Sequence, residues 1–198
     1  MVKLEKLPLD SITVNSTFGL RDITLDGRKY WWHNGIDLKA DLGTPVYAVA
    51  EGIVKRAVEN IGSYGNYLVV DHGKFGTLYA HLSSYVVQVG QTVSSGDILG
   101  YTGQTGAVTA PHLHFEIRVC EYDSFWDRCE CDSNVFMRCV DPKIYFDDYE
   151  ERNAELAVDL AATIVKKSAG LEDKTMDYIV NDYKFGEDLI KKLAKAIK

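Results

Sequence analysis

Glycine residues recur at short intervals through residues 1 to about 119 and separate short runs rich in β-branched and aromatic residues. Runs of this kind, bounded by turn residues, are typical of antiparallel sheets and barrels. No stretch in this region keeps a helical period over three turns, so we predict a mainly β fold built on a small antiparallel β-sheet. Strands are expected within VYAVAEG (46–52), YLVVDHG (67–73), TLYAHL (77–82), YVVQVG (85–90) and HLHFEIRV (112–119). Turns are expected at Gly43, Gly52, Gly62, Gly65, Gly73, Gly76, Gly90, Gly96, Gly103 and Gly106.

The pattern changes twice in the rest of the chain. Residues 120–141 hold all four cysteines between two strand-like segments, which predicts a hairpin insertion at about 119–140. From about Tyr149 the apolar residues follow a helical period. The broad apolar face carries Leu156, Leu160 and Ile164, with Ala157, Ala161 and Val165 beside them. We therefore predict a domain over residues 1–148 and a helical C-terminal extension over residues 149–198. Its first helix is expected to end at Gly170, with a second over Glu172–Tyr183 and a third beyond Gly186.

Composition excludes several classes of protein. Of the 198 residues 46% are hydrophobic and only 4 are proline, so neither a collagen-like nor a disordered chain is expected. The net charge of −7, from 29 acidic and 22 basic residues, argues against a nucleic-acid partner. No apolar run approaches the ~20 residues that span a bilayer, so no membrane span is expected.

Histidines occur in short polar segments together with one well-spaced aspartate. His33 and Asp37 lie four residues apart in HNGID, and an extended strand would point His112 and His114 of PHLHFE to the same side. His81 lies between these motifs, in the strand-like TLYAHL. Each histidine taken singly is open to a structural interpretation, and an HxH pair is as often a plain strand pair. Together they match the needs of a catalytic zinc ion, which takes three protein ligands and keeps a fourth position for water.

With these motifs in this order, the sequence resembles the lysostaphin-type zinc metallopeptidases, peptidoglycan endopeptidases with HxxxD and HxH motifs. The resemblance covers about residues 8–146 and is interrupted by the cysteine-containing segment. The matching stretches are FGLRD (18–22), HNGIDLKADLGTPVYAVAEGIV (33–54), YGNYLVVDHG (64–73), TLYAHLSS (77–84), VGQTVSSGDILGYTGQTG (89–106), PHLHFEIR (111–118) and VDPKIYF (140–146).

The resemblance implies that His33, Asp37 and His114 bind one zinc ion per chain. It further implies that His81 and His112 are catalytic without being ligands, acting on the attacking water and on the oxyanion. All five positions keep the family's residue types, so an active peptidase of bacterial peptidoglycan is expected over residues 1–148. The family's fold is a small antiparallel sheet with a groove over the metal.

Four further residues have open roles. His72, in the VVDHG turn, is expected to shape the fold. Asn66 and Tyr101 are candidates to line the groove. Glu116 is either a carboxylate that orients a metal ligand or an outward-facing strand residue.

The cysteines follow the spacing Cx8CxCx7C, which is not that of a zinc ribbon. Two disulfides within the hairpin insertion, a second metal site and reduced thiols all remain open. If disulfides form, the symmetric positions of Cys120 and Cys139 make them the first pair, with Cys129 and Cys131 unassigned.

The location and the role of the helical extension are less constrained. Peptidoglycan lies outside the cytoplasm, yet the opening segment lacks the apolar core of a Sec signal peptide. A trimmed or mature chain, delivery by a phage or another export route, and an intracellular substrate are the alternatives, of which we favour phage or mobile-element delivery at the cell wall. The extension is expected either to pack on its own domain or on itself, or to dock a partner.

Two other functions compete with the peptidase. A catalytically silent scaffold or wall-binding member of the same family is one, although such members usually lose ligands. A biotinyl- or lipoyl-carrier-like hairpin module is the other. The carrier would need a modified lysine, for which Lys74 in DHGKFG is the nearest candidate, and it would leave the histidines unexplained.

Overall fold

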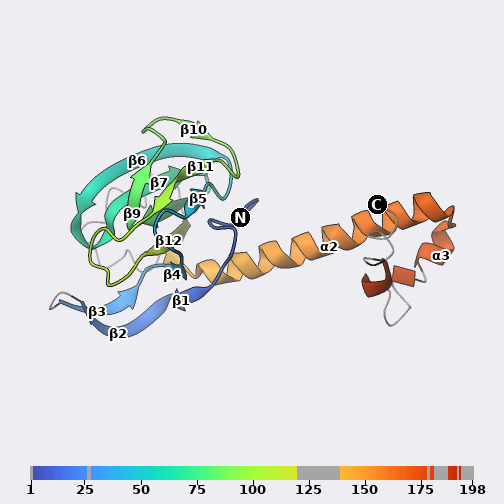
Figure 1. Cartoon of the computed structure of the whole chain (residues 1–198), viewed down its shortest axis with the longest axis horizontal. Coiled ribbons are helices and arrows are strands. Elements are labelled where there is room, and N and C mark those ends of the chain that lie inside the picture. Colours follow the sequence, from blue (N-terminus) through green and yellow to red (C-terminus); the bar gives the residue numbers. More distant parts are fainter. Residues whose placement is uncertain are drawn as a thin grey trace. The chain divides into compact units, whose positions relative to one another are not determined.

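Antiparallel strands dominate the N-terminal part of the chain, as a computed structural model shows (Figure 1). The structure describes residues 2–25, 28–119, 139–177, 179–180, 187–190 and 192. Within these residues the largest sheet has the order β1-β4-β12-β8-β7-β6-β10, with β13 paired to β12. Its strands are β1 Val14–Ser16, β4 Ile36–Lys39, β6 Gly52–Ile61, β7 Gly65–Asp71, β8 Phe75–Ala80, β10 Thr92–Val93, β12 His112–Val119 and β13 Cys139–Val140. The prediction of a mainly β, antiparallel fold is confirmed.

Two smaller sheets accompany the large one. One has the order β5-β11-β9, and the other is a two-stranded ribbon of β2 and β3. A short 3-10 turn, Gly62–Tyr64, joins β6 to β7. The strands are β2 Gly19–Leu25, β3 Arg28–His33, β5 Pro45–Tyr47, β9 Leu82–Tyr85 and β11 Ile98–Thr102.

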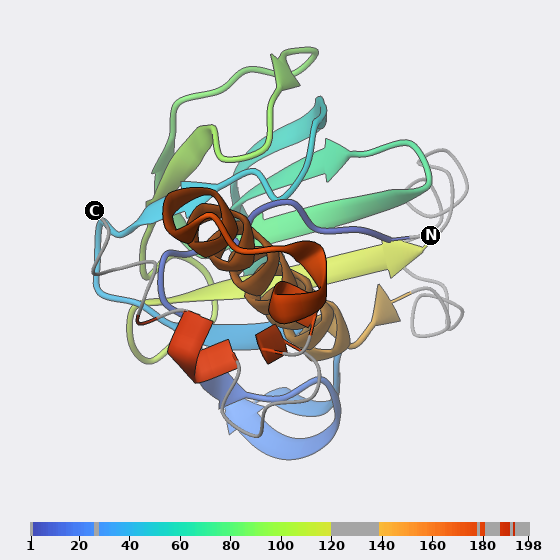
Figure 2. The ribbon, with the colours of Figure 1, turned by 90° about the vertical axis from the view of Figure 1, so that its right-hand side faces the viewer.

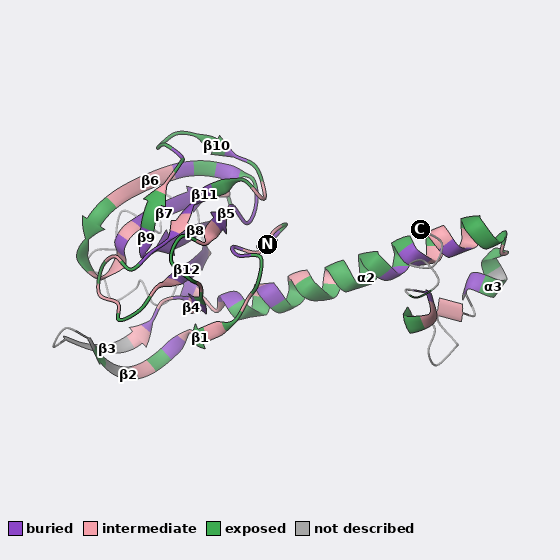
Figure 3. Cartoon of the chain, viewed as in Figure 1, coloured by how far each residue is buried: buried purple, intermediate pink, exposed green. Residues whose placement is uncertain are grey.

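Strand β12 lies between β4 and β8 in the sheet (Figure 2). It separates a polar face from the apolar core. Because side chains alternate along a strand, Leu113, Phe115 and Ile117 all enter the core, where each has 0% exposure. The intervening positions 112, 114, 116 and 118 carry histidine, histidine, glutamate and arginine on the opposite face. Figure 3 shows the buried strands around β12 in purple. The core therefore fixes which way this polar row points.

Some expected strands and turns differ from the structure. Residues 48–51 of VYAVAEG leave the strand after Tyr47, since Ala48 exchanges backbone hydrogen bonds with Gly96 and Asp97. Similarly, Val86 to Val89 of YVVQVG lie beyond the end of β9. Gly52 is the first residue of β6 and Gly76 lies within β8, so the turns expected there are wrong. At Gly52 a Cβ atom would lie 2.6 Å from the Asp71 carbonyl oxygen, so glycine serves close strand packing there.

Helix α2 spans Pro142–Ala169 and begins seven residues before the predicted start at Tyr149. Proline suits the first position of a helix, and the Asp141 carboxylate accepts a hydrogen bond from the Lys143 backbone N–H at 2.9 Å. The ring of Phe146 stacks on Phe115, with 5.7 Å between centroids, which ties the first turns of α2 to the core. The first turns of α2 thus belong to the sheet domain, as predicted for residues up to 148, but they are helical, whereas the helical period was expected to begin only at Tyr149.

The C-terminal segment is helical, and only one side of the expected broad apolar face is buried. Leu156 and Leu160 are each 63% exposed, whereas Ala161 and Val165 are buried in a cluster with Met176 and Ile190. Gly170 follows α2 with a φ of 66°, as a glycine that ends a helix does. Of the expected helix over 172–183, α3 covers Asp173–Asp177. Residues 187–190 are helical too.

By its internal packing the chain divides into two compact units, Met1–Tyr149 and Glu150–Lys198. No helix in the described ranges has both the length and the hydropathy needed to cross a bilayer. The expected cysteine hairpin and its Cys120, Cys129 and Cys131 lie outside the described residues. Cys139 is buried in β13, and no disulfide occurs among the residues described.

Candidate metal centre

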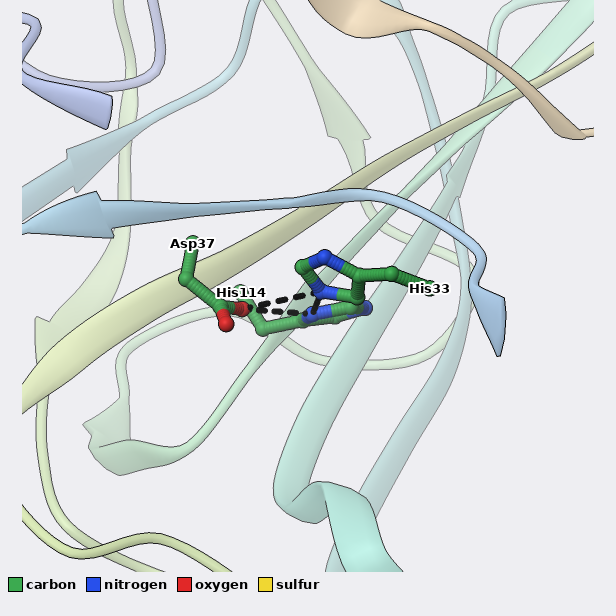
Figure 4. A group of neighbouring side chains, drawn as sticks. All are labelled: His33, Asp37 and His114. Atoms are coloured by element: carbon green, nitrogen blue, oxygen red, sulfur yellow. Dashed lines mark hydrogen bonds and ion pairs between the residues drawn. The ribbon is translucent and has the colours of Figure 1, made fainter. Parts of the chain in front are cut away.

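Three side chains that are far apart in the sequence meet on the polar face of the sheet (Figure 4). His33 ends β3, Asp37 lies in β4 and His114 lies in β12. His33 Nε2 lies 3.1 Å from Asp37 Oδ1 and 3.0 Å from His114 Nδ1, and His114 Nδ1 lies 2.9 Å from Asp37 Oδ1. Donors ~2.0–2.2 Å from one tetrahedral zinc ion lie about 3.4 Å apart, close to these separations. The structure thus brings together all three predicted metal ligands.

Strand register and one glycine create this meeting point. Strands β12 and β4 are antiparallel with His114 opposite Asp37, so the two side chains share one face. Between His33 and Asp37 the chain bends at Gly35, where a Cβ atom would lie 2.1 Å from the Phe115 carbonyl oxygen. A larger residue at position 35 would push β12 away from the bend.

Both imidazoles are held with one ring nitrogen directed at the meeting point. The Nδ1–H group of His33 donates to the Thr17 carbonyl oxygen at 2.8 Å, and His114 Nε2–H donates to Glu116 Oε1 at 3.0 Å. Because each outer nitrogen carries a proton, the inner nitrogen of each ring faces Asp37 Oδ1 and could give its lone pair to a metal ion in place of a proton. Two nitrogen lone pairs and a carboxylate oxygen at this spacing form a donor set that fits zinc.

A buried polar network supports His114 from behind. Glu116 has 0% exposure, and its Oε1 also accepts a 2.5 Å hydrogen bond from the Tyr64 hydroxyl. Its Oε2 accepts hydrogen bonds from Arg118 Nε at 2.8 Å and Nη2 at 2.6 Å. Burial raises the pKa of Glu116, but the Arg118 charge and the hydrogen bond from His114 outweigh it and hold the pKa far below its usual range. Glu116 is therefore a charged carboxylate that orients His114, and it is not an outward-facing strand residue.

The pKa values show that the centre favours positive charge. Burial raises the pKa of Asp37, but hydrogen bonds from His112, His114 and His33 outweigh it and hold that pKa well below its ordinary value. Burial likewise lowers the pKa of His114, yet hydrogen bonds to Asp37 and Glu116 raise it to about 9. A cation at the inner nitrogen of His114 would satisfy the same two carboxylates.

His81 and His112 lie beside the three ligands. Their ring centroids are 4.6 Å apart, and His112 Nε2 is 3.6 Å from Asp37 Oδ1. His81 Nδ1–H donates to the Thr105 carbonyl oxygen at 2.9 Å, which leaves Nε2 as an acceptor. Burial, together with the charges of His114 and His112, lowers the pKa of His81 to about 3, so its ring is neutral at pH 7. His81 also has a φ of 62°, and such conformations in non-glycine residues cluster at functional sites.

His81 and His112 line a pocket of about 440 Å³. Asn66, Tyr101 and His72 are not among the residues that line it. Asn66 instead bonds the Leu82 carbonyl oxygen at 3.1 Å. The lining residues are Asn15, Ser16, Arg21, Trp32, His33, Asn34, Asp37, Ser63, Tyr64, His81, Ala107, Val108, Thr109, His112 and His114.

Arg21, Tyr64 and Arg118 lie in stretches that resemble the family, but no role at the site was predicted for them. Arg118 continues the alternation of His112, His114 and Glu116 along β12, so extending that pattern by one step would have found it. Tyr64 and Arg21 come from other elements, and no spacing in the sequence connects them to the histidines.

Known proteins support a peptidase site. Residues 32–125 match Peptidase family M23. The chain is 40% identical over 117 residues to the peptidoglycan DD-endopeptidase ShyA of Vibrio cholerae, covering 58% of this chain and 27% of that protein.

Solved structures share the fold. A zinc-containing peptidase from Vibrio cholerae matches with a TM-score of 0.56 and 32% identity, covering 71% of this chain and 39% of that one. The catalytic domain of lysostaphin from Staphylococcus simulans matches with a TM-score of 0.56 and 29% identity, covering 69% of this chain and 92% of that domain. The chain spans about a quarter of the length of the curated relative ShyA.

Proposed function

The chain belongs to peptidase family M23, and from this premise we propose that it is a zinc-dependent endopeptidase of bacterial peptidoglycan. The proposal is carried by one observation. Two imidazole lone pairs and a carboxylate oxygen converge within a pocket that two further histidines line. We propose one zinc ion per chain, bound by His33, Asp37 and His114. The peptidase domain is proposed to span residues 1–148.

Bound at this centre, zinc would act as a Lewis acid and lower the pKa of a coordinated water to ~7. His81 presents a neutral Nε2 and is proposed to accept the proton of the attacking water and to return it to the leaving amine. His112, with Nε2 directed at the centre, is proposed to stabilise negative charge on the carbonyl oxygen of the scissile amide when it carries a proton. Glu116 keeps the outer nitrogen of His114 protonated and thereby keeps its inner nitrogen available.

The names of the relatives support the substrate. ShyA is named as a peptidoglycan DD-endopeptidase, and lysostaphin as an antimicrobial peptidase. We therefore propose peptidoglycan peptides as the substrate and the cell wall or periplasm as the place of action. Delivery by a phage or another export system stays a prediction, as do the docking role of residues 149–198 and the groove roles of Asn66 and Tyr101.

No observation favours the competing functions. A catalytically silent member would lack part of the histidine and aspartate set, whereas the structure assembles all five side chains around one pocket. The carrier alternative, with Lys74 as the modified residue, finds no support in the family match.

Two variants test the proposal. We expect His114→Ala to lose both zinc and hydrolysis of purified sacculi, because one of three ligands is gone. We expect His81→Asn to keep zinc and to lose at least 100-fold in kcat/KM, in line with general acid–base contributions of about 10²–10⁴. Asparagine is chosen because it tolerates the positive φ at position 81 better than alanine does.

Metal content and thermal unfolding provide readouts that do not depend on activity. Zinc added after chelation should raise the Tm of the parent and of His81→Asn, since a ligand that binds the native state stabilises it. It should leave the Tm of His114→Ala unchanged. Sacculi cleaved by His114→Ala at the parental rate would contradict the ligand assignment.

A further inference from the structure

Arg21 of β2 lines the pocket. It lies beside Oδ2 of Asp37, whereas the histidines lie beside Oδ1. The pairing of β2 with β3 sets Gly19 beside His33 and so brings Arg21 to the metal centre. Asp37 directs Oδ1 at His33 and His114 (Figure 4), whereas its Oδ2 lies 3.6 Å from Arg21 Nη1. The Arg21 side chain is 19% exposed. A guanidinium therefore stands at the rim of the candidate centre.

Asp37 does not need this guanidinium to balance its charge. Its Oδ1 already faces three imidazoles, those of His33, His114 and His112, and a divalent cation among them would exceed the single negative charge. A separation of 3.6 Å is also longer than a charge-assisted hydrogen bond, which is ~2.7–2.9 Å. Arg21 therefore adds positive charge beyond what the proposed ligand set requires.

The other described residues that line the pocket do not offset this positive charge. Among the described residues that line it, Arg21 is the one permanent cation and Asp37 the one carboxylate. Next to Arg21, Trp32 provides an apolar wall and is packed edge-on against Phe18, with 5.5 Å between ring centroids. The whole chain carries a net charge of −7, so the cation in this pocket is not one of a general excess of basic residues.

We propose that Arg21 recognises a carboxylate of the peptide substrate next to the scissile amide. A guanidinium offers five N–H groups in a planar fork that matches a carboxylate, a geometry that lysine lacks. The preferred substrate class is then a peptide that carries a free carboxylate close to the bond that is cut. This inference rests on the proposed function and names a feature of its substrate.

Cross-linked muropeptides in two forms test the inference. One sample is left untreated, and in the other the carboxylates are converted to carboxamides with a carbodiimide and ammonia. We expect the parent to have a kcat/KM at least tenfold higher on the untreated sample. In Arg21→Gln that ratio should fall to about threefold or less, and Arg21→Lys should give an intermediate ratio.

Lys39→Gln is the matched control, because it removes the same charge from an exposed position two residues beyond Asp37. It should keep the parental ratio. Calorimetric titration with the purified peptide products should show at least tenfold weaker binding to Arg21→Gln than to Lys39→Gln, with the zinc content of both equal to the parent's.

The outcomes separate three cases. If the parent cleaves both samples equally, or if Arg21→Gln keeps the full ratio, Arg21 does not read a carboxylate. If Arg21→Gln loses zinc and slows equally on both samples, Arg21 only positions Asp37, and the inference is overturned. If the parent cleaves neither sample while binding zinc, the proposed function itself fails.

Discussion

Arg118 and Glu116 form a fully buried ion pair directly behind His114. Arg118→Met should be strongly destabilising, because it leaves a buried carboxylate without its cation, and breaking such a pair costs about 3–5 kcal/mol. Glu116→Gln keeps the volume and an acceptor oxygen for His114, but it leaves the buried Arg118 without its carboxylate, so it should be destabilising as well and should also affect the metal. Loss of a carboxylate behind a metal-binding histidine typically weakens metal affinity by about 10–100-fold.

Urea unfolding and zinc competition measure the two effects separately. Both variants should lower the free energy of unfolding, because each leaves one buried charge unpaired, and Glu116→Gln should in addition show the weaker zinc affinity. An Arg118→Met protein as stable as the parent would contradict the buried pair.

His72 has a structural role, which the pH dependence of the free energy of unfolding should reveal. Its Nδ1–H donates to the Glu51 carbonyl oxygen at 2.8 Å, and its Nε2 accepts from the Thr77 hydroxyl at 2.9 Å. Burial lowers the pKa of His72 below its ordinary value of 6.5. The unfolded chain therefore takes up a proton near pH 6.5 that the native protein refuses, and acidification below that pH favours unfolding.

We expect the parent to lose more stability than His72→Gln between pH 7.5 and pH 5. Glutamine cannot take up the proton, and all other titrating groups are common to the two proteins. The free energy of unfolding, measured by urea titration at several pH values, gives the difference directly. A difference that stays constant over this range would remove His72 as the cause.

The five histidine and aspartate positions were predictable from the sequence because each belongs to a short motif in extended chain. Alternation along a strand placed His112 and His114 on one face, whereas the meeting of this pair with His33 and Asp37 was implied by the resemblance to a known family. Groups that act through the backbone left no such signal. The carbonyl oxygens of Thr17 and Thr105 orient His33 and His81, yet any residue supplies a carbonyl oxygen.

Among the structural elements, the pair β4 and β12 sets the geometry of the centre. Gly35→Ala should disrupt that pair, because the new Cβ atom would lie 2.1 Å from the Phe115 carbonyl oxygen, which belongs to a hydrogen-bonded strand. We expect a loss of several kcal/mol in stability, comparable with overpacking of a core (typically ~1–3 kcal/mol, occasionally more). Zinc affinity should fall as well, since Asp37 and His114 are held by the same register.

Gly43→Ala is a useful comparison for this prediction. Gly43 has a φ of 82°, but a Cβ atom added there would have no neighbour within 4 Å, so its substitution strains only a local turn. Thermal unfolding and zinc titration of both variants distinguish the two effects. If Gly35→Ala bound zinc as tightly as Gly43→Ala, close strand approach would not be what glycine provides at position 35.

Element boundaries were predictable where local pattern and tertiary environment agree. Strand β12 matches HLHFEIRV because its alternation is also its division between core and pocket. Gly52 failed as a turn because a neighbouring strand, which no local pattern reveals, requires a small residue there. Helix α2 starts early for the same kind of reason, since Phe146 is buried by the sheet and not by its own helix.

At the scale of the whole molecule, the division after Tyr149 predicts what the N-terminal unit needs in order to fold. A chain of residues 1–151 should bind zinc and hydrolyse soluble muropeptides as the full chain does, because it keeps the whole unit Met1–Tyr149. A chain that ends at Asp141 should be much less stable, because it lacks Phe146, which is 3% exposed and stacks on Phe115. Removing a buried phenylalanine side chain costs about 3–5 kcal/mol.

In the full chain, Phe146→Ala should reproduce this loss in urea unfolding, whereas Leu160→Ala, at a position 63% exposed, should not. If residues 1–151 failed to fold while Phe146→Ala stayed as stable as the parent, the sheet would depend on the C-terminal unit instead of on the first turns of α2.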